Sequence, residues 1–361
     1  MSKTCFAAIL SLSLIFALSP DVTAEDLPIR GLHCSVPSQE DIPLCVKFIR
    51  EALPKEGVNV LVLEFNYRYQ YESHPELVSR GALSKEDVEK IVDACRDANV
   101  RLIPQFNCLG HQSWSKQTFP LLTVYPEFDE TPGKYPNNED IYCRSYCPLH
   151  PKVHEVVFAL IDELADVCQS DAFHVGMDEV FLLGEDDCPR CKGKNKAKLL
   201  AYEIRLLRDH LAENKRTLWM WGDRFLDGET TKIGKWEASM NDTQSAIDMV
   251  PKDIVICDWH YERAHPTASY FALKGLNVLS CPWRKSEVAL GLLEQIRLVR
   301  QLGNDAVASR MQGMLHTTWC GMSSFVKAYY GDEESLKRRS ARETADCFKK
   351  LYTAIRTDTG K

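Results

Sequence analysis

Two adjacent carboxylates, Asp178 and Glu179, offer the clearest chemistry in this sequence. They directly follow the apolar run 172–177, and a second apolar run, 180–183, comes after them. Two carboxylates in a partly desolvated pocket do not both ionise easily, so one is held as a neutral acid beside an anionic partner. Glycosidic bond cleavage uses such a pair. On a solvated loop the same two residues would carry no such meaning.

Polar and aromatic side chains lie within or after the other apolar runs. Five of the seven tryptophans are at or near the ends of these runs. Tryptophan is also an ordinary core residue, but several at one end of a fold favour a ring-binding pocket over simple packing. Among the polar and aromatic residues in these positions are Arg30, His111, Trp221, Asp223, Trp259, Tyr261, Trp283 and Trp319.

Eight short apolar runs alternate with amphipathic stretches from residue 28 onward. Because the runs are nearly continuous in apolar residues, they predict parallel strands that are covered on both faces. The alternation predicts a single-domain (β/α)8 barrel, whose active site lies at the carboxyl ends of the strands. A doubly wound open sheet is the alternative, but no G-x-G-x-x-G follows the first run. The runs are 29–34, 58–65, 100–106, 172–177, 217–222, 253–259, 276–283 and 313–319.

Helices are expected over 84–98, 153–168, 196–211, 287–302 and 335–352. Ser84 and Asp87 have the spacing of an N-cap and its third helical residue. The longest irregular stretch, 107–150, follows the third strand, where barrel enzymes build their active-site loops.

The first 24 residues have the pattern of a secretory signal peptide. Lys3 precedes an apolar run over 5–18, and small residues follow at 22–24. An uncleaved anchor is the alternative, although the run is short for a membrane span. We therefore expect a signal peptide over 1–24, a catalytic barrel over 25–361, and a secreted or periplasmic protein.

Composition limits the partners of the chain. With 44 Lys and Arg against 51 Asp and Glu, the formal net charge is −7, and no basic block occurs. This argues against nucleic-acid binding. Beyond residue 24, no stretch is long and apolar enough to span a membrane. The oligomeric state is left open.

The number of cysteines predicts disulfide bonds. Loss of Cys5 with the signal peptide leaves thirteen, an odd number, so we expect some disulfides and at least one unpaired thiol. Two close pairs, 143/147 and 188/191, could form disulfides or hold a structural zinc ion, and export favours disulfides. No H-E-x-x-H spacing occurs, which argues against a zinc hydrolase. We expect no cofactor and no catalytic metal.

The segment FHVGMDEV (173–180) resembles the H-x-G-G-D-E signature of glycoside hydrolase family 20, the β-N-acetylhexosaminidases. RLIPQFNCLGHQSW (101–114) is similar to the third-strand segment of that family, RGLHC (30–34) to its first-strand segment, and CPLHPKVHEVVFALIDELADVC (147–168) to its approach to the fourth strand. The segments 62–77 and 178–185 resemble the hexosaminidase D branch. The likeness covers most of residues 28–320.

The resemblance implies a (β/α)8 barrel and a retaining mechanism in which the 2-acetamido oxygen of the substrate attacks the anomeric carbon. It implies that Glu179 is the general acid and that Asp178 holds the acetamido N–H. It further implies that polar side chains of Arg30, His111 and Asp223 contact the sugar. The tryptophans that would surround the sugar ring and its acetamido group are Trp221, Trp259, Trp283 and Trp319. Tyr261 is placed on the acetamido oxygen by chain order alone. The substrate would be a terminal β-linked N-acetylglucosamine or N-acetylgalactosamine.

Two positions depart from the family pattern. Met177 replaces the second glycine of the signature, and Gln105 stands where many members have glutamate. A catalytically weak glycan-binding barrel is therefore kept as the alternative function, and the intact carboxylate pair argues for the enzyme.

Overall fold

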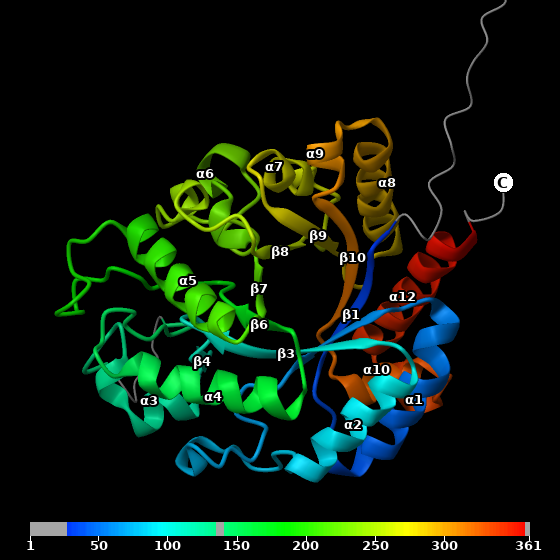
Figure 1. The fold of residues 1–361 in the computed structure, drawn as a ribbon, viewed down its shortest axis with the longest axis horizontal. Coiled ribbons are helices and arrows are strands. Elements are labelled where there is room, and N and C mark those ends of the chain that lie inside the picture. The colour runs from blue at the N-terminus through cyan, green and yellow to red at the C-terminus, as the bar shows by residue number, and fades with distance from the viewer. Residues whose placement is uncertain (1–26, 135–140, 358–361) are drawn as a thin grey trace, which may run out of the picture.

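The computed structural model describes residues 27–134 and 141–357, and its parallel strands close into a barrel (Figure 1). The strand order is β1, β10, β9, β8, β7, β6, β3, β2, with β2 returning to β1. This confirms the (β/α)8 barrel and all eight predicted strands, and it excludes the open sheet. The strands are β1 Ile29–Ser35, β2 Val60–Glu64, β3 Arg101–Cys108, β6 Ala172–Gly176, β7 Thr217–Trp221, β8 Val255–Trp259, β9 Asn277–Cys281 and β10 Met311–Thr318.

Helices surround the barrel. The longer ones are α1 Ile42–Glu56, α2 Lys85–Asp97, α4 Val153–Val167, α5 Lys196–Glu213, α7 Thr267–Leu273, α8 Ser286–Leu302, α10 Met322–Tyr329 and α12 Arg339–Thr357. The predicted cap of α2 is confirmed, since Ser84 Oγ accepts from the Asp87 backbone N–H at 3.2 Å and Asp87 Oδ2 accepts from the Ser84 N–H at 3.4 Å. The expected helix over 335–352 is divided between the short α11 (Glu333–Lys337) and α12.

Apolar side chains form two layers of core. One cluster fills the barrel interior and includes Val62, Trp219 and Leu315. The other lies between the strands and the helices and includes Leu32 and Cys34. Strand residues therefore alternate between the two layers, so that Leu32 and Cys34 of β1 face the helices while His33 faces the interior beside Trp221.

Two long stretches at the carboxyl end of the barrel carry much of the candidate site. The first follows β3 and includes the hairpin of β4 (Ser113–Trp114) and β5 (Gln117–Thr118) and the short α3 (Pro120–Val124). The second runs from the end of β6 to α5. The first lies within 107–150, the stretch in which active-site loops were expected from the sequence.

The cysteines do not behave as expected, because none in the described residues forms a disulfide. The proposed grouping of two pairs is also wrong, since Cys143 lies beside His111 and Glu179, whereas Cys147 packs against Cys188 and Cys191.

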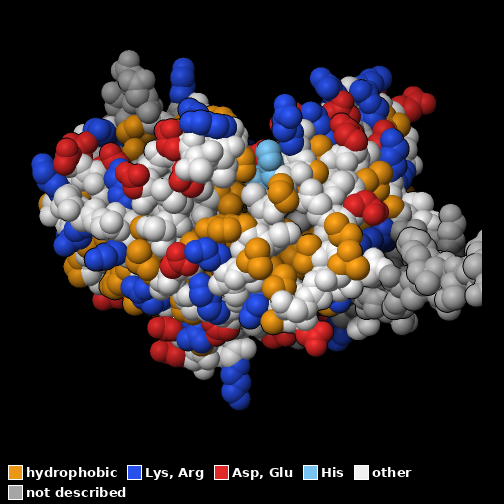
Figure 2. Space-filling view, turned by 90° about the horizontal axis from the view of Figure 1, so that it is seen from above, with side chains coloured by type: hydrophobic (Ala, Val, Ile, Leu, Met, Phe, Trp, Pro, Cys, Tyr) orange, Lys and Arg blue, Asp and Glu red, His pale blue; other side chains and the backbone are white. Residues whose placement is uncertain are grey.

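The visible surface mixes charges of both signs. Figure 2 shows basic and acidic side chains interspersed, with hydrophobic side chains among them. The described helices include none that is long and apolar enough to cross a membrane. The expected signal peptide falls within residues 1–26, outside the described part of the chain.

Candidate active site

The carboxylate pair sits on a tight turn at the end of β6. Gly176, Met177 and Glu179 have backbone φ angles of +69°, +73° and +49°. A side chain at Gly176 would meet Asn107, because a Cβ there would lie 2.5 Å from Asn107 Oδ1 and 2.9 Å from its Cα. Glycine thus allows β6 to approach β3 closely, while Met177 adopts the left-handed conformation with its side chain buried.

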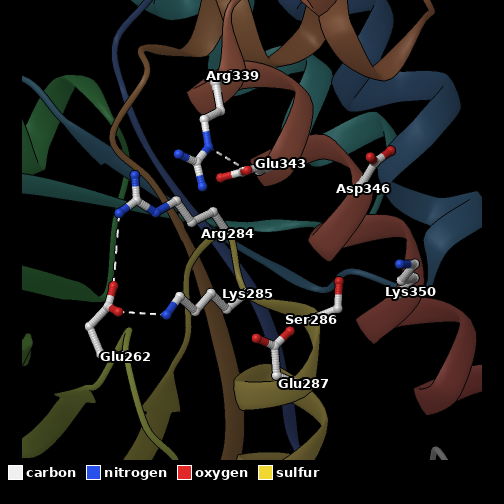
Figure 3. Close-up of a pocket in the computed structure, with 9 residues that line it drawn as sticks. All are labelled: Glu262, Arg284, Lys285, Ser286, Glu287, Arg339, Glu343, Asp346 and Lys350. Atoms are coloured by element: carbon white, nitrogen blue, oxygen red, sulfur yellow. Dashed lines mark hydrogen bonds and ion pairs between the residues drawn. The ribbon is translucent and has the colours of Figure 1, made fainter.

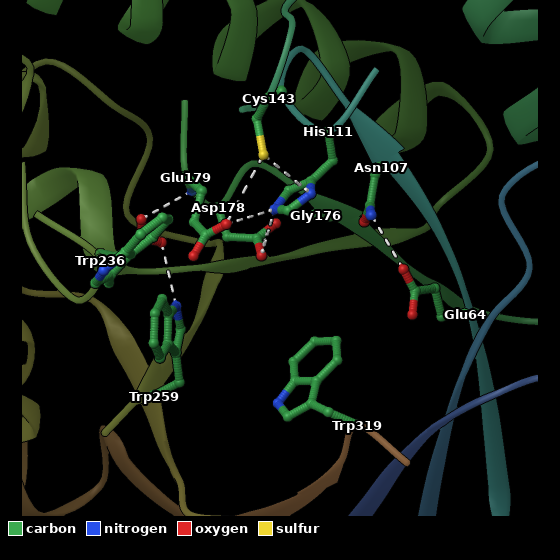
Figure 4. A network of polar contacts seen from close by, with 12 residues as sticks. Glu64, Asn107, His111, Cys143, Gly176, Asp178, Glu179, Trp236, Trp259 and Trp319 are labelled. Carbon is green, nitrogen blue, oxygen red and sulfur yellow. Dashed lines mark hydrogen bonds and ion pairs between the residues drawn. The ribbon is translucent and has the colours of Figure 1, made fainter. Parts of the chain in front are cut away.

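His111 bridges the two carboxylates (Figure 4). Its Nε2 lies 3.1 Å from Asp178 Oδ2 and 3.3 Å from Glu179 Oε2. Burial opposes the imidazolium, but the neighbouring carboxylates outweigh it and hold the pKa of His111 well above its ordinary value. The buried pair therefore has a cation between its two members.

Asp223 supports the pair from the next strand. Its Oδ2 accepts from the Glu179 backbone N–H at 3.0 Å and from Arg224 Nε at 2.6 Å. Its Oδ1 accepts from Trp259 Nε1 at 3.3 Å. Burial raises the pKa of Asp223 to about 6. Asp223 thus fixes the backbone of Glu179 and the ring of Trp259.

Aromatic side chains at or just after the ends of β7, β8 and β10 lie at the same carboxyl end of the barrel as the carboxylates. Trp221 is buried and its ring centre lies 5.9 Å from that of Trp319, which is 38% exposed. Trp259 and Tyr261 have ring centres 5.0 Å apart. Trp319 Nε1 donates to the Tyr261 hydroxyl at 2.6 Å, so the Tyr261 oxygen accepts there and its own O–H remains to be donated.

One of the sequence-based candidates, Trp283, lies farther out. Trp283 Nε1 donates to Thr344 Oγ1 at 2.9 Å, and its ring centre lies 5.5 Å from that of Tyr261. The ring of Trp283 therefore packs against Tyr261, and its indole N–H is hydrogen-bonded to Thr344 of α12.

Arg30 is not part of the candidate site, which corrects the expectation. Its Nε donates to Gly57 O and its Nη1 to Leu27 O, both at 2.7 Å. It stands near the start of β1, at the opposite end of the barrel from Asp178, and in the outward-facing register.

A buried polar chain runs beside the site. His33 Nε2 lies 3.0 Å from Gln105 Oε1, Gln105 Nε2 donates to Asn107 Oδ1 at 2.8 Å, and Asn107 Nδ2 donates to Glu64 Oε1 at 3.0 Å. Burial lowers the pKa of His33 to about 4 and raises that of Glu64. Gln105, which departs from the family pattern, is thus the central link, and His33 is a neutral imidazole whose Nε2–H donates to Gln105.

An exposed aromatic row, which sequence reasoning missed, flanks Glu179. Trp114, Tyr142, Trp236 and Phe181 have successive ring centres 4.8, 5.0 and 5.4 Å apart. Part of this row lines a cavity of about 300 Å³ that also includes Cys143, whose Sγ lies 3.9 Å from Glu179 Oε2. Trp236 does not follow a strand directly, so no strand-end signal marked it.

A larger cavity, of about 460 Å³, contains none of the predicted site residues (Figure 3). Its charged groups largely neutralise one another: Lys285 and Arg284 face Glu262 at 2.5 and 3.8 Å, and Arg339 pairs with Glu343 at 2.7 Å. This balance leaves little net attraction for a charged ligand.

Metal-ligating side chains converge in two places among the described residues. One group is His111, Cys143 and Glu179, within the candidate site. There His111 already forms ion pairs with both carboxylates, so the arrangement is explained without a metal. The second group lies between the two long loops.

Comparison with known proteins places this geometry in context. Residues 63–286 match the model of the glycosyl hydrolase family 20 catalytic domain. The chain is 24% identical over 217 residues to a beta-hexosaminidase of Emericella nidulans, covering 52% of this chain and 32% of that protein. It is 25% identical over 182 residues to Hexosaminidase D of Bos taurus, covering 47% and 48%.

The fold is also similar to a solved structure, that of a beta-N-acetylhexosaminidase from Bacteroides fragilis. The TM-score is 0.61 at 14% identity, covering 90% of this chain and 66% of that one.

The sequence matches with the fungal and bovine relatives extend over less than half of the length of each relative.

Proposed function

Because the chain belongs to glycosyl hydrolase family 20, we propose that it is an exo-acting β-N-acetylhexosaminidase. The proposed substrates are glycans that end in β-linked N-acetylglucosamine or N-acetylgalactosamine. The observation that carries the proposal is the buried pair of Asp178 and Glu179, bridged by His111 at the carboxyl end of β6. The names of the similar proteins support the same class of substrate.

Glu179 is the proposed general acid. Protonated, it gives its proton to the glycosidic oxygen as that bond breaks, and it then takes a proton from the water that completes hydrolysis. Its backbone is held by Asp223 and its side chain lies beside His111 and Cys143. Its position next to the aromatic row suggests that the leaving group lies over Tyr142 and Trp236.

Asp178 is proposed to organise the acetamido group of the substrate. Its Oδ2 pairs with His111, whereas Oδ1 is buried and has no hydrogen-bond partner among the described residues. An acetamido N–H would satisfy Oδ1. As the acetamido oxygen attacks the anomeric carbon, positive charge develops on the oxazolinium ring, and the anionic Asp178 stabilises it.

Tyr261 is proposed to orient the attacking oxygen. Since its hydroxyl oxygen accepts from Trp319, its own O–H can donate to the acetamido carbonyl. Trp221, Trp259 and Trp319 supply flat apolar faces for the sugar ring and its methyl group.

Export is proposed from the sequence. The apolar run over 5–18, followed by small residues at 22–24, supports a cleaved signal peptide and a secreted or periplasmic enzyme. Amino-terminal sequencing of the protein from its native host tests this, and a chain that retains Met1 in the cytoplasm would contradict it.

The proposed activity is tested with aryl β-glycosides of N-acetylglucosamine, N-acetylgalactosamine and glucose. We expect turnover of the acetamido sugars alone, and a loss of about 10²–10⁴-fold in Glu179→Gln. Glu203→Gln is the control for the loss of a carboxylate elsewhere in the fold, because Glu203 is buried and binds Tyr146 and His154 outside the site.

Two outcomes would contradict the proposal. Hydrolysis of the plain glucoside at a comparable rate would indicate an enzyme nucleophile instead of the substrate's own acetamido group. Binding of N-acetylglucosamine by calorimetry, without turnover of any substrate, would identify a glycan-binding barrel.

A further inference from the structure

Four metal-ligating side chains converge outside the candidate active site. They are Glu130, Cys147, Cys188 and Cys191, each at most 1% exposed. One donor atom from each lies within 4.8 Å of all the others. Cys147 Sγ is 3.4 Å from both other sulfurs. With zinc–sulfur bonds of about 2.3 Å, the edge of a tetrahedron is about 3.8 Å, so small shifts would suffice.

One carboxylate oxygen of Glu130 is hydrogen-bonded to the protein, and the other is not. Its Oε1 accepts from the backbone N–H groups of Gly184 and Glu185 at 2.6 and 3.2 Å. Its Oε2 is buried with no hydrogen-bond partner, and no cationic side chain among the described residues forms an ion pair with it. Burial of an unpaired carboxylate is costly, and a bound cation would remove that cost.

The backbone around the CxxC turn also favours negative sulfur. The Cys191 N–H points to Cys188 Sγ at 3.4 Å, an interaction that stabilises a thiolate. A disulfide would join only two of the three sulfurs and would leave the third and Glu130 unexplained, and no disulfide is formed here. A single cation bound by all four groups accounts for the whole cluster.

We propose that Glu130, Cys147, Cys188 and Cys191 bind a structural zinc ion. Three thiolates and one carboxylate suit zinc, and four protein ligands leave no open position for substrate or water. Two ligands come from the loop after β3 and two from the loop after β6. The zinc therefore joins the loop that carries His111 to the loop that carries Asp178 and Glu179.

This proposal is independent of the proposed activity, and metal analysis tests it. The full chain, purified without chelators or a metal-binding tag, is expected to contain about one zinc per chain by plasma mass spectrometry. Cys188→Ser/Cys191→Ser and Glu130→Ala are expected to lose most of that zinc. Cys95→Ala is the matched control, because Cys95 is equally buried in α2, away from the cluster.

Thiol mapping of the unmodified chain keeps the test valid if a variant does not fold. Cys147, Cys188 and Cys191 should resist alkylation in the native protein and become alkylated after a chelator has removed the zinc. A chain without zinc, or with a different metal at one equivalent, would overturn the proposal. Zinc retained in full by both variants, or a native disulfide between Cys147 and either partner, would also overturn it.

Discussion

Replacement of Gly176 by alanine should lower the free energy of unfolding more than the same change at another glycine with a left-handed backbone conformation. Gly81 is the control, because its φ of +75° is close to the +69° of Gly176 and a Cβ there would have no heavy atom within 4 Å. Alanine in this conformation costs about 1–2 kcal/mol, which is the whole expectation for Gly81→Ala. At Gly176 the new Cβ would also lie 2.9 Å from the Cα of Asn107. Overpacking of this kind adds about 1–3 kcal/mol, so the expected total is about 2–5 kcal/mol.

Urea unfolding followed by tryptophan fluorescence measures the difference in stability between the two variants. Activity should separate them further, because Asn107 would have to move, and it donates to Glu64 and accepts from Gln105 beside the turn that carries Asp178 and Glu179. We expect kcat/KM to fall about 10–100-fold in Gly176→Ala and to stay near wild type in Gly81→Ala. Equal losses of stability in the two variants would refute the steric argument.

Three further predictions concern the groups around the pocket. Ion pairs that outweigh burial raise the pKa of His260 to about 9, so the stability that they supply is present below pH 6.5 and is lost as pH rises through about 9. Over this range, the free energy of unfolding from urea titration should fall about 3 kcal/mol more in wild type than in His260→Gln. The same pH dependence in both proteins would contradict this. Tyr261→Phe should lower kcat/KM on the acetamido glycosides about 10–100-fold with unchanged urea stability, whereas unchanged kinetics would remove Tyr261 from the mechanism. Asp223→Ala should destabilise the fold by about 3–5 kcal/mol, because the buried Arg224 would lose its ion pair and keep only its bonds to backbone carbonyls. Asp253→Ala removes an exposed ion pair and should cost less than about 1 kcal/mol, so similar urea midpoints in the two variants would contradict this.

The barrel could be predicted because its strands are covered on both faces. The segment Val60–Glu64 is almost wholly apolar, as a strand between interior and helices must be, and the Ser84 cap marked the start of α2. The helix α1 gave a weaker pattern, since it carries a proline at its start and Pro54 near its end. Its end is set by Gly57, whose φ of +77° closes the last turn.

The candidate site could be predicted only where chemistry is local in sequence. Asp178 and Glu179 directly follow a strand, so their position at the barrel end follows from the strand itself. Cys143 and Trp236 lie within long loops, whose paths depend on contacts made by distant segments. Arg30 shows the opposite error, because nearness to a strand does not say which end or which face of the strand a residue occupies.

The seam of the barrel has a consequence for how the protein is made. Arg30 of β1 pairs with Met314 of β10, and these two strands lie side by side in Figure 1. During synthesis β1 emerges before β10 and keeps an unpaired edge until β10 has left the ribosome. The strand β6, which leads to the candidate pair Asp178 and Glu179, is made while the barrel is still open. We therefore expect closure by β10 to be the late step of folding, and truncations that remove β10 to aggregate through the free edge of β1.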